Sequence, residues 1–514
     1  MRLVHIFLLV TFGFTSPLPA DTYWVSADGQ ASWAMASSTS PLSGSATCTL
    51  ETANANAGAG DTVYIRGGNY SRQTIKPIRS GIADDERIIF SSHKGEKVRF
   101  EESDGIQLEQ KSFITVTGIE FRNMKMFFRI LGGGHNTISH CLFDGRSEDS
   151  GVWAGAQIGS DRRRQPSTHN WVHHCQFYRF VYKSERPNRG ALLDIGNLNN
   201  GDGTNGSTHN RIEHNVLAYG GHHTFGVYSK YNVIRFNYIH NETNPKNWDF
   251  PGYRGGVTQG TSGGWCLYEG NRFGYAGQAG IGLRSPNNIL RRNQFYHNAQ
   301  GGIQVVTNAV GKDRADENYI YHNTFFRNGY GSKFPSFQGG MYFASWSRVS
   351  PKQNVVKNNL FFDNKNGAIS YDRPAEPQTI ENNWNNRNDP VFADITETGP
   401  DVVDQPDLRL RAGSPAIDSA GWLTSVTTES GRGDVLEVAD ARYFMDGWTI
   451  IEGDLIQLEG QSEPVGIVSV DYDNNQIKIR RDVTFTKGQG VSLAYAGTSP
   501  DPGAFETNLP RQLK

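Results

Sequence analysis

The chain has 514 residues, enough for one large repeat domain and a small second domain. Its charge is nearly balanced, with 50 Lys and Arg residues against 52 Asp and Glu residues and a formal net charge of -2. This balance gives no electrostatic reason to expect nucleic acid or an anionic membrane as a partner. The 58 Gly, 28 Phe and 21 Tyr residues suit many short strands that are joined by tight turns.

The first 20 residues have the pattern of a secretory signal peptide. Arg2 supplies a positive charge, Leu3 to Phe14 form a short apolar run, and Ala20 is a small residue at the expected cleavage point. The apolar run is too short to span a bilayer, and no later segment has 18 consecutive apolar residues. We therefore expect a secreted or periplasmic protein with no transmembrane segment.

Residues 21–75 are predicted to cap the N-terminal end of the repeat domain. Thr22 to Val25 and the start of Asp61 to Tyr70 are rich in β-branched and aromatic residues, as strands are. Between them, Leu50 to Ala57 predicts a short helix. Such an element would cover the open end of a solenoid.

A short phrase returns through residues 76–395 and predicts a solenoid. Each copy has an apolar residue, then a small polar residue that is usually Asn, then another apolar residue, at a spacing of about 22 to 40 residues. The copies are His135 to Phe143, His169 to Phe177, His209 to Leu217, Tyr231 to Ile239, Asn287 to Phe295, Glu317 to Phe325 and Gln353 to Phe361.

Short strands and Asn-containing turns favour an all-β fold, a right-handed parallel β-helix that spans residues 21–420. Further runs with strand composition are Arg87 to Phe90, Lys97 to Phe100, Phe113 to Val116, Ile303 to Val306 and Gly340 to Phe343. We expect the recurring Asn to adopt left-handed backbone angles and to stack in hydrogen-bonded ladders. The histidines beside it are interpreted as turn and ladder residues: His140, His173, His174, His214 and His322.

The four cysteines show no metal-binding spacing. Cys141 and Cys175 occupy the phrase position where other copies have Asn, which predicts stacked interior residues. A disulfide between them is the alternative in an oxidising compartment.

The pattern changes near the C-terminus. Arg409 to Ala420 is interpreted as a closing rung of the β-helix. Residues 421–500 lose the Asn phrase and alternate like strands, which predicts a small antiparallel β module. Residues 501–514 are expected to form a closing segment and tail, and the protein is expected to be a monomer.

The candidate active site lies in residues 222–284. Outward positions on the rungs of a parallel β-helix stack about 4.8 Å apart, so ionisable residues on neighbouring rungs can act together. Alignment of Asn237 with Asn293 places Tyr228 level with Arg284. The long Gly- and Asn-rich segment 240–264 suits one wall of a substrate cleft, with Trp248 and Tyr253 as candidate substrate-binding residues.

These residue types suit β-elimination on a uronate polymer. That reaction needs a cation for the carboxylate, a base and an acid for the leaving oxygen. Arg284 or Arg254 could supply the cation, and Tyr228 the acid; the candidate bases are His222, His223 and Lys230.

Arg162 and Arg163 belong to a run of three arginines two to three rungs earlier. Such a run is either a solvated edge or a subsite for an anionic sugar chain. An anionic polysaccharide is therefore the expected partner.

The segment from Asp194 to Asp202 carries closely spaced oxygen ligands around Gly and is similar to a calcium loop, although its spacing is not that of an EF-hand. Asp194 and Asp202 are the candidate metal ligands, which makes calcium the candidate cofactor. An ordinary polar loop is the alternative.

Three functions remain open at this level. A polysaccharide lyase needs a cluster of Lys, Arg, His and Tyr in the cleft. A glycoside hydrolase or an epimerase on the same scaffold is the second hypothesis, and a hydrolase needs paired carboxylates there. Its candidate carboxylates are Asp194, Glu213, Asp249 and Glu269. A non-catalytic carbohydrate-binding surface protein, with aromatic platforms, is the third.

Several motifs resemble exported β-helix proteins of the pectate-lyase-like superfamily. They are YWVSADG and GDTVYIRGGNY near the start, SFITVTGIEF in the middle, and GSPAIDSA and DPGAFE near the end. The resemblance covers most of the chain except residues 421–500. It implies the β-helix fold but only weakly a function, because this fold carries lyases, hydrolases, epimerases and adhesive proteins.

The stretch Val227 to Asn237 resembles the Lys-bearing rung of the chondroitinase-B-like alginate lyases. This resemblance implies that Lys230 is the base and Arg284 the second catalytic residue, acting with a carboxylate-bound calcium. The chain departs from that family in having His222 and His223, and no Glu pair, just upstream of Lys230. The Trp171 to Cys175 stretch resembles a rung of pectate lyases, with His173 where they have a calcium-binding Asp.

Overall fold

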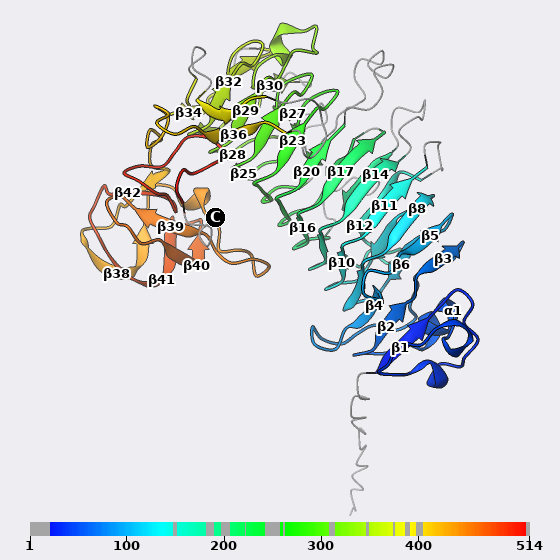
Figure 1. Ribbon diagram of the computed structural model, residues 1–514. Coiled ribbons are helices and arrows are strands. Elements are labelled where there is room, and N and C mark those ends of the chain that lie inside the picture. Colours follow the sequence, from blue (N-terminus) through cyan, green and yellow to red (C-terminus); the bar gives the residue numbers. More distant parts are fainter. Residues whose placement is uncertain are drawn as a thin grey trace, which may run out of the picture.

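A computed structural model gives the architecture of the chain (Figure 1). It describes residues 21–146, 152–180, 190–196, 206–221, 223–241, 258–260, 263–307, 314–345, 349–373, 376–385, 391–396 and 405–509. The expected signal peptide lies outside these residues. Within them, no helix is long and apolar enough to cross a membrane.

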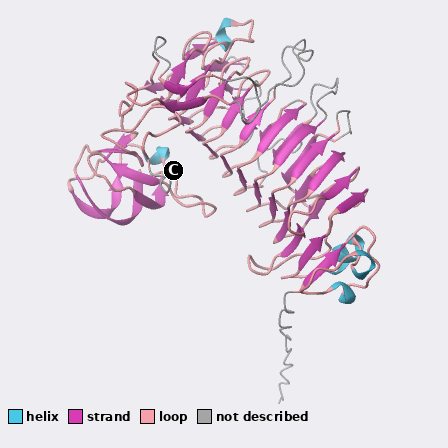
Figure 2. Ribbon diagram, in the orientation of Figure 1, coloured by secondary structure: helices cyan, strands magenta, loops and turns pink. Residues whose placement is uncertain are grey.

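Three long sheets of parallel strands dominate the described residues, with 13, 11 and 10 strands. We name them sheets A, B and C. From β4 to β33 the chain passes from sheet A to sheet B to sheet C and back to sheet A. Each such turn adds one strand to every sheet, so the sheets form a coil. This coil confirms the predicted right-handed parallel β-helix and appears as stacked rungs in Figure 2.

The strands of each sheet follow one another along the helix axis. Sheet A contains β1 (Thr22–Val25), β2 (Thr62–Ile65), β4 (Ile88–Ser92), β7 (Ile114–Thr117), β10 (Thr137–Ser139), β13 (Trp171–His173), β16 (Arg211–Glu213), β19 (Val233–Arg235), β22 (Leu267–Glu269), β25 (Ile289–Arg291), β28 (Tyr319–Tyr321), β31 (Val355–Lys357) and β34 (Thr379–Glu381). Sheet B contains β3 (Gly68–Ser71), β5 (Val98–Glu101), β8 (Glu120–Met124), β11 (Leu142–Gly145), β14 (Gln176–Phe180), β17 (Val216–Gly220), β20 (Tyr238–His240), β23 (Arg272–Gly274), β26 (Gln294–Tyr296), β29 (Thr324–Phe326) and β32 (Leu360–Phe362). Sheet C contains β6 (Ile106–Glu109), β9 (Phe128–Leu131), β12 (Ala154–Gly159), β15 (Ala191–Ile195), β18 (Phe225–Val227), β21 (Thr258–Gly260), β24 (Ile281–Leu283), β27 (Ile303–Thr307), β30 (Met341–Ser345) and β33 (Ile369–Tyr371).

The helices are short and few among the described residues (Figure 2). The predicted N-terminal helix is present as α1 (Leu50–Asn56), next to β1 at the start of the coil (Figure 1). Thr49 caps it, because its side-chain oxygen accepts a hydrogen bond from the backbone N–H of Thr52. The 3-10 helices are η1 (Ala34–Ala36), η2 (Gly44–Ala46), η5 (Pro335–Phe337) and η7 (Ala441–Tyr443).

The core of the coil consists of columns of identical or similar side chains, because parallel in-register rungs place equivalent residues on top of one another. In sheet B, the rings of Phe273, Phe295, Phe325 and Phe361 stack at centroid distances of 5.1, 4.9 and 4.6 Å. All four rings are buried. Each rung therefore buries its apolar face only against its neighbours.

The predicted Asn ladders are confirmed. The prediction that the Asn itself adopts left-handed backbone angles was wrong. Asn293 donates from Nδ2 to Oδ1 of Asn323, which donates to Asn359, both at 3.0 Å, inside the coil. The left-handed backbone belongs to the residue before each Asn, such as Arg292 (φ 55°) and His322 (φ 51°). The corner needs the positive φ, whereas the Asn side chain must point inward to reach the next rung.

The histidines at these corners stack outside the ladder. His140, His174 and His214 each have a φ between 52° and 54°, and their rings stack at 5.0 and 4.9 Å. His322 takes the same corner, and its Nδ1 lies 2.8 Å from the carbonyl oxygen of Asp501. These positions agree with turn and ladder roles. His173 differs, because it lies on strand β13.

The four cysteines are all buried free thiols in this structure. Cys141 and Cys175 stack on adjacent rungs inside the coil, as predicted for phrase positions. Burial, and then the neighbouring Cys141, raise the pKa of the Cys175 thiol well above its ordinary value.

The C-terminal module is a six-stranded antiparallel sheet, as predicted. Its strands are β37 (Thr424–Ser425), β42 (Gly490–Leu493), β39 (Leu455–Leu458), β40 (Val465–Asp471), β41 (Gln476–Phe485) and β38 (Gly431–Glu437). The module lies beside the later rungs (Figure 1) and shares one apolar cluster with the outer face of sheet A. Val233, Leu267, Ile289 and Tyr319 supply the sheet A side of that cluster.

The predicted closing rung was wrong. β36 (Asp407–Leu410) pairs antiparallel with β35 (Phe392–Asp394) and joins none of the three parallel sheets. The segment packs instead in an apolar cluster with Phe326 and Leu360 of sheet B. Its apolar alternation resembles that of a rung because both bury one face against the coil.

Candidate active site

Sheet C carries the polar cluster with the strongest resemblance to a catalytic centre. In β15, Leu193 and Ile195 point into the core, so Asp194 between them faces outward. In the next rung, Gly226 pairs in register with Asp194. The outward side of these two rungs holds Asp194, His223 and Tyr228.

Asp194, His223 and Tyr228 form one continuous polar chain. His223 Nε2 lies 3.0 Å from Asp194 Oδ1 and 3.2 Å from the phenol oxygen of Tyr228. All three side chains are buried, with relative exposures of 3%, 1% and 1%. A carboxylate on one side of an imidazole fixes its orientation, as in known catalytic sites.

The environment keeps the Tyr228 phenol protonated. Burial, and then the charge of Asp194, raise the pKa of Tyr228 well above its ordinary value of 10.0, while Arg284 acts in the opposite direction. A phenol that stays protonated at neutral pH can donate a proton but cannot act as a base.

Gly226 is the site residue that sequence reasoning missed. A Cβ at this position would meet Asp194 Oδ1 at 2.4 Å, Tyr228 Cε2 at 2.6 Å and the Tyr228 phenol oxygen at 2.8 Å. The glycine therefore makes the room in which the other two side chains meet. A glycine inside a strand run is the signal of such a close approach.

Arg284 lies at the position predicted for it. Val227 and Leu283 both pair with Gly260 of the rung between them, so Tyr228 and Arg284 are level and two rungs apart. Arg284 is half-buried, and its charge acts on both Tyr228 and Tyr342. The site thus has a cation near its proton donor.

Lys230 lies at the same edge of sheet C but apart from the polar chain. It is exposed in the turn after β18, where its backbone forms a bridge with Gly264. A lysine acts as a base most readily when burial removes water from its ammonium group. The geometry therefore gives His223 better support than Lys230 as the proton-transfer group.

The arginine run lies two rungs before β18, at the same ends of the sheet C strands as Lys230. Arg162, Arg163 and Arg164 follow β12 and are exposed. Asp161 holds the turn, since its Oδ1 accepts hydrogen bonds from the backbone N–H groups of Arg163 and Gln165 at 2.9 and 2.8 Å. The exposed guanidinium groups are available to an anionic chain.

Five predicted site residues lie outside the described residues: His222, Arg254, Trp248, Tyr253 and Asp202. In the described part of the chain, no three His, Cys, Asp or Glu side chains gather as metal ligands. Asp194 directs Oδ1 to His223. The described residues therefore do not by themselves build the predicted calcium site.

The other carboxylates proposed for a hydrolase do not converge with Asp194 where the structure describes them. Glu213 and Glu269 lie on sheet A, where Arg211 and Arg291 pair with them at 2.8 and 2.7 Å. Asp249 lies outside the described residues. His173 also faces out from sheet A, and burial, followed by His174, lowers its pKa to about 4.

A family model described as "Right handed beta helix region" matches residues 195–404. The described residues have the fold of a right-handed parallel β-helix. No curated protein matches the chain.

Several solved structures are similar to this β-helix chain at low sequence identity. The pectate lyase Pel9A is 15% identical, with a TM-score of 0.45 over 95% of this chain and 98% of that chain. A PL6 family polysaccharide lyase from Pseudopedobacter saltans is 14% identical, with a TM-score of 0.46 over 72% of this chain and 96% of its own. A complex of XylC with xylose is 11% identical, with a TM-score of 0.41 over 91% and 99%. At these identities and scores the likenesses do not identify the activity of this chain.

Proposed function

We propose that this protein is a secreted polysaccharide lyase that cleaves a uronate-containing polymer by β-elimination. The observation that carries the proposal is the hydrogen-bonded chain of Asp194, His223 and Tyr228, with the charge of Arg284 beside it. It combines an oriented imidazole, a protonated phenol and a cation, which are the groups that this reaction requires.

In this proposal, the two ring nitrogens of His223 have different tasks. Nε2 keeps its proton, held by Asp194, and Nδ1 takes the proton from the carbon beside the substrate carboxylate. The electron pair of that C–H bond forms the new carbon–carbon double bond. The bond to the leaving oxygen breaks at the same time.

Tyr228 completes the proton balance. Its hydroxyl gives its proton to the leaving oxygen, and the phenolate regains one from His223 Nε2 across the 3.2 Å contact. The proton taken at Nδ1 thus remains on the ring, which is then neutral. After product release, Nδ1 loses this proton to solvent and Nε2 regains one from solvent, which restores the starting tautomer. Arg284 would neutralise the substrate carboxylate as charge develops.

The depth of the site sets a requirement on binding. Because Asp194, His223 and Tyr228 are at most 3% exposed, they must become accessible when the polymer binds. Arg162 and Arg163 would hold the anionic chain two rungs before Tyr228, about 10 Å away along the axis. Lys230 remains the alternative base, because it lies at the same edge.

The test is the ultraviolet absorbance of the unsaturated sugar that elimination produces. The purified protein is incubated with a panel of uronate polymers, with and without calcium. We expect a rise with one polymer, reduced about 10²- to 10⁴-fold in Tyr228→Phe and His223→Ala. Tyr268→Phe, which removes a buried hydroxyl from the core, is the matched control and should keep full activity.

Other outcomes have defined meanings. Loss of activity in Lys230→Ala but not in His223→Ala would transfer the base role to Lys230. New reducing ends without unsaturated product would replace the lyase by a hydrolase. The absence of both signals on every polymer would overturn an enzymatic function.

A further inference from the structure

Arg129 of sheet C has a half-buried side chain and no protein partner among the described residues. It lies on β9, where the flanking Phe128 and Ile130 point into the core, so its guanidinium faces outward. Its Nε is shielded from solvent and has no hydrogen-bond partner. In the described part of the chain, no carboxylate forms an ion pair with this guanidinium. Arg129 therefore keeps an uncompensated positive charge.

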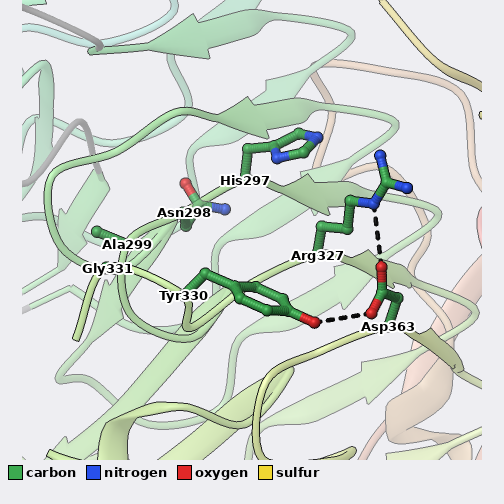
Figure 3. A pocket seen from close by; sticks show the side chains of 7 residues that line it. All are labelled: His297, Asn298, Ala299, Arg327, Tyr330, Gly331 and Asp363. Carbon is green, nitrogen blue, oxygen red and sulfur yellow. Dashed lines mark hydrogen bonds and ion pairs between the residues drawn. The ribbon is translucent and has the colours of Figure 1, made fainter. Parts of the chain in front are cut away.

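Two other guanidinium groups on the outside of the coil show the usual, paired arrangement. Arg327 lines a cavity of 380 Å³ at the corner between sheets B and C, and its Nε donates to Asp363 Oδ2 at 3.0 Å. Figure 3 shows Arg327 and Tyr330 both directed toward this carboxylate. Arg291 of sheet A lies 2.6 Å from Asp454. A guanidinium that faces a carboxylate of its own protein has less need of an anionic ligand than one that faces none.

Arg129 belongs to the outward row of sheet C that leads to the candidate active site. Gln107, Arg129, Gln157 and Asp194 are in register, with one residue on each successive rung. Two rungs separate Arg129 from Asp194, which is about 10 Å along the axis of the coil. A polymer that lies along sheet C at Asp194 would therefore also pass over Arg129.

The neighbours of Arg129 in this row are neutral amides. Gln107 Nε2 donates to the carbonyl oxygen of Asp104 at 2.7 Å, which fixes the amide. Gln157 is half-buried, and its amide can donate to and accept from hydroxyl groups. Glu109 is exposed on the rung before Arg129 and forms no ion pair with it within the described residues. One cation between two amides suits a sugar that carries a carboxylate and hydroxyl groups.

An unpaired, half-buried guanidinium lowers the stability of the free protein, because part of its hydration is lost without a replacement. A bound anion would supply the missing acceptor, and a guanidinium can bind a carboxylate through two parallel hydrogen bonds. Arg162 and Arg163 follow β12, the next strand of the sheet, and add positive charge to the same part of sheet C. The charge distribution thus favours an anionic chain along these rungs.

We propose that Arg129 is a substrate-binding residue that takes the carboxylate of one uronate residue of the polymer, about 10 Å from Asp194. This inference rests on the proposed function for its ligand class and for the course of the polymer along sheet C. Binding at Arg129 requires no cleavage. A polymer that binds through Arg129 but is not cleaved would therefore remove the lyase activity and leave this subsite.

The first test is equilibrium binding in the Tyr228→Phe background, in which cleavage is suppressed. The probes are polygalacturonate, alginate and hyaluronate, with neutral dextran for comparison, in isothermal titration calorimetry on the full chain. We expect one uronate polymer to bind, and Arg129→Gln to weaken this binding about tenfold or more. Lys125→Gln is the matched control, because it removes the same charge at an exposed position between β8 and β9. It should leave the affinity within about twofold.

The second test separates binding from chemistry. Arg129 does not touch the reacting atoms, so Arg129→Gln alone should raise KM about tenfold and leave kcat within about twofold. Oligosaccharides that are too short to reach from Tyr228 to Arg129 should be cleaved equally by this variant and by the unsubstituted protein.

The melting temperature distinguishes a binding residue from a structural one. Arg129→Gln should keep or raise the melting temperature, because it removes an unpaired cation. A lower melting temperature with unchanged polymer affinity would make Arg129 a structural residue. The inference is overturned if no uronate polymer binds, if Arg129→Gln and Lys125→Gln weaken binding equally, or if dextran binds as tightly as the uronate polymer.

Discussion

Arg291 of β25 and Asp454 of the C-terminal module form a two-point ion pair. Arg291 Nη1 and Nη2 lie 2.7 and 2.6 Å from the two carboxylate oxygens of Asp454, 163 residues away in the chain. Both side chains are almost fully buried, and Arg291 Nε also donates to Glu269 at 2.7 Å. The pair fixes the module to the outer face of sheet A.

Loss of one partner should destabilise the protein strongly. Asp454→Asn leaves the Arg291 charge buried with only Glu269 as a carboxylate partner. Breaking a buried pair costs about 3–5 kcal/mol. We expect a lower midpoint of urea denaturation for Asp454→Asn. Glu452→Gln, which removes an exposed partner of Arg480, should cost no more than about 1 kcal/mol. Similar midpoints for both variants would contradict the anchoring role.

The Asn ladder gives a second prediction. Asn323 Oδ1 accepts hydrogen bonds from both the backbone N–H and Nδ2 of Asn293, and its Nδ2 donates to Asn359. Asn323→Ala leaves these buried groups without their partner, at a cost of about 3 kcal/mol. Asn69→Ala, at an exposed position on sheet B, is the control and should leave the denaturation midpoint almost unchanged. A small effect of Asn323→Ala would show that water replaces the amide.

The fold could be predicted because the coil repeats one local arrangement. Inward Asn and Phe residues return at each rung, and their spacing in the sequence is the length of one turn of the coil. The corner residue could not be assigned in this way. Arg292 and Asn293 are neighbours, and nothing in their order says which one turns the chain.

The contact surface of the module could not be predicted either. The outward positions of sheet A hold Glu213, Arg235, Glu269 and Arg291 in register, which in a sequence is typical of a solvated face. Arg291 is buried where the module packs on sheet A and Asp454 pairs with it. A contact between residues so far apart leaves no periodic signal.

The candidate site could be predicted in part. Tyr228 and Arg284 could be aligned because each follows a strand of sheet C by the same count. The contact of Asp194 with His223 depends on how the passage from sheet B to sheet C bends, which the repeat does not determine. The cavity at Tyr330 escaped notice because its residues belong to three rungs whose lengths differ.

The pH dependence of stability should contain a contribution from Glu506. Burial, and then the charge of Asp501, raise its pKa from the ordinary 4.5 to about 8, while Arg292 acts in the opposite direction. The folded state therefore holds a proton that the unfolded state loses. This contribution is fully present below pH 4.5 and is lost as the pH rises through about 8.

Glu506→Gln should flatten this loss, because the amide is neutral at every pH and keeps an oxygen that can accept from Ala496 or Asp501. The measurement is the denaturation midpoint of both proteins at pH values from about 5 to 8, the range over which the raised pKa of Glu506 affects stability. Glu463→Gln, at an exposed position, should follow the unsubstituted protein. Parallel curves for Glu506→Gln and the unsubstituted protein would exclude Glu506 as the cause.

The last prediction concerns Gly226, which lies between Asp194 and Tyr228. In Gly226→Ala, the added Cβ would lie 2.4 Å from Asp194 Oδ1 and 2.6 Å from Tyr228 Cε2, so at least one of these side chains must move. A displacement of about 1 Å in a catalytic group can cost on the order of 10²-fold in rate. If this cluster catalyses elimination, formation of the unsaturated product should fall by that factor while substrate binding at the exposed arginines persists.

Gly159→Ala is the control on the same sheet, since its Cβ would meet its nearest neighbour at an ordinary 3.5 Å. Full activity in Gly226→Ala would separate the polar chain from catalysis and leave it a structural feature of sheet C.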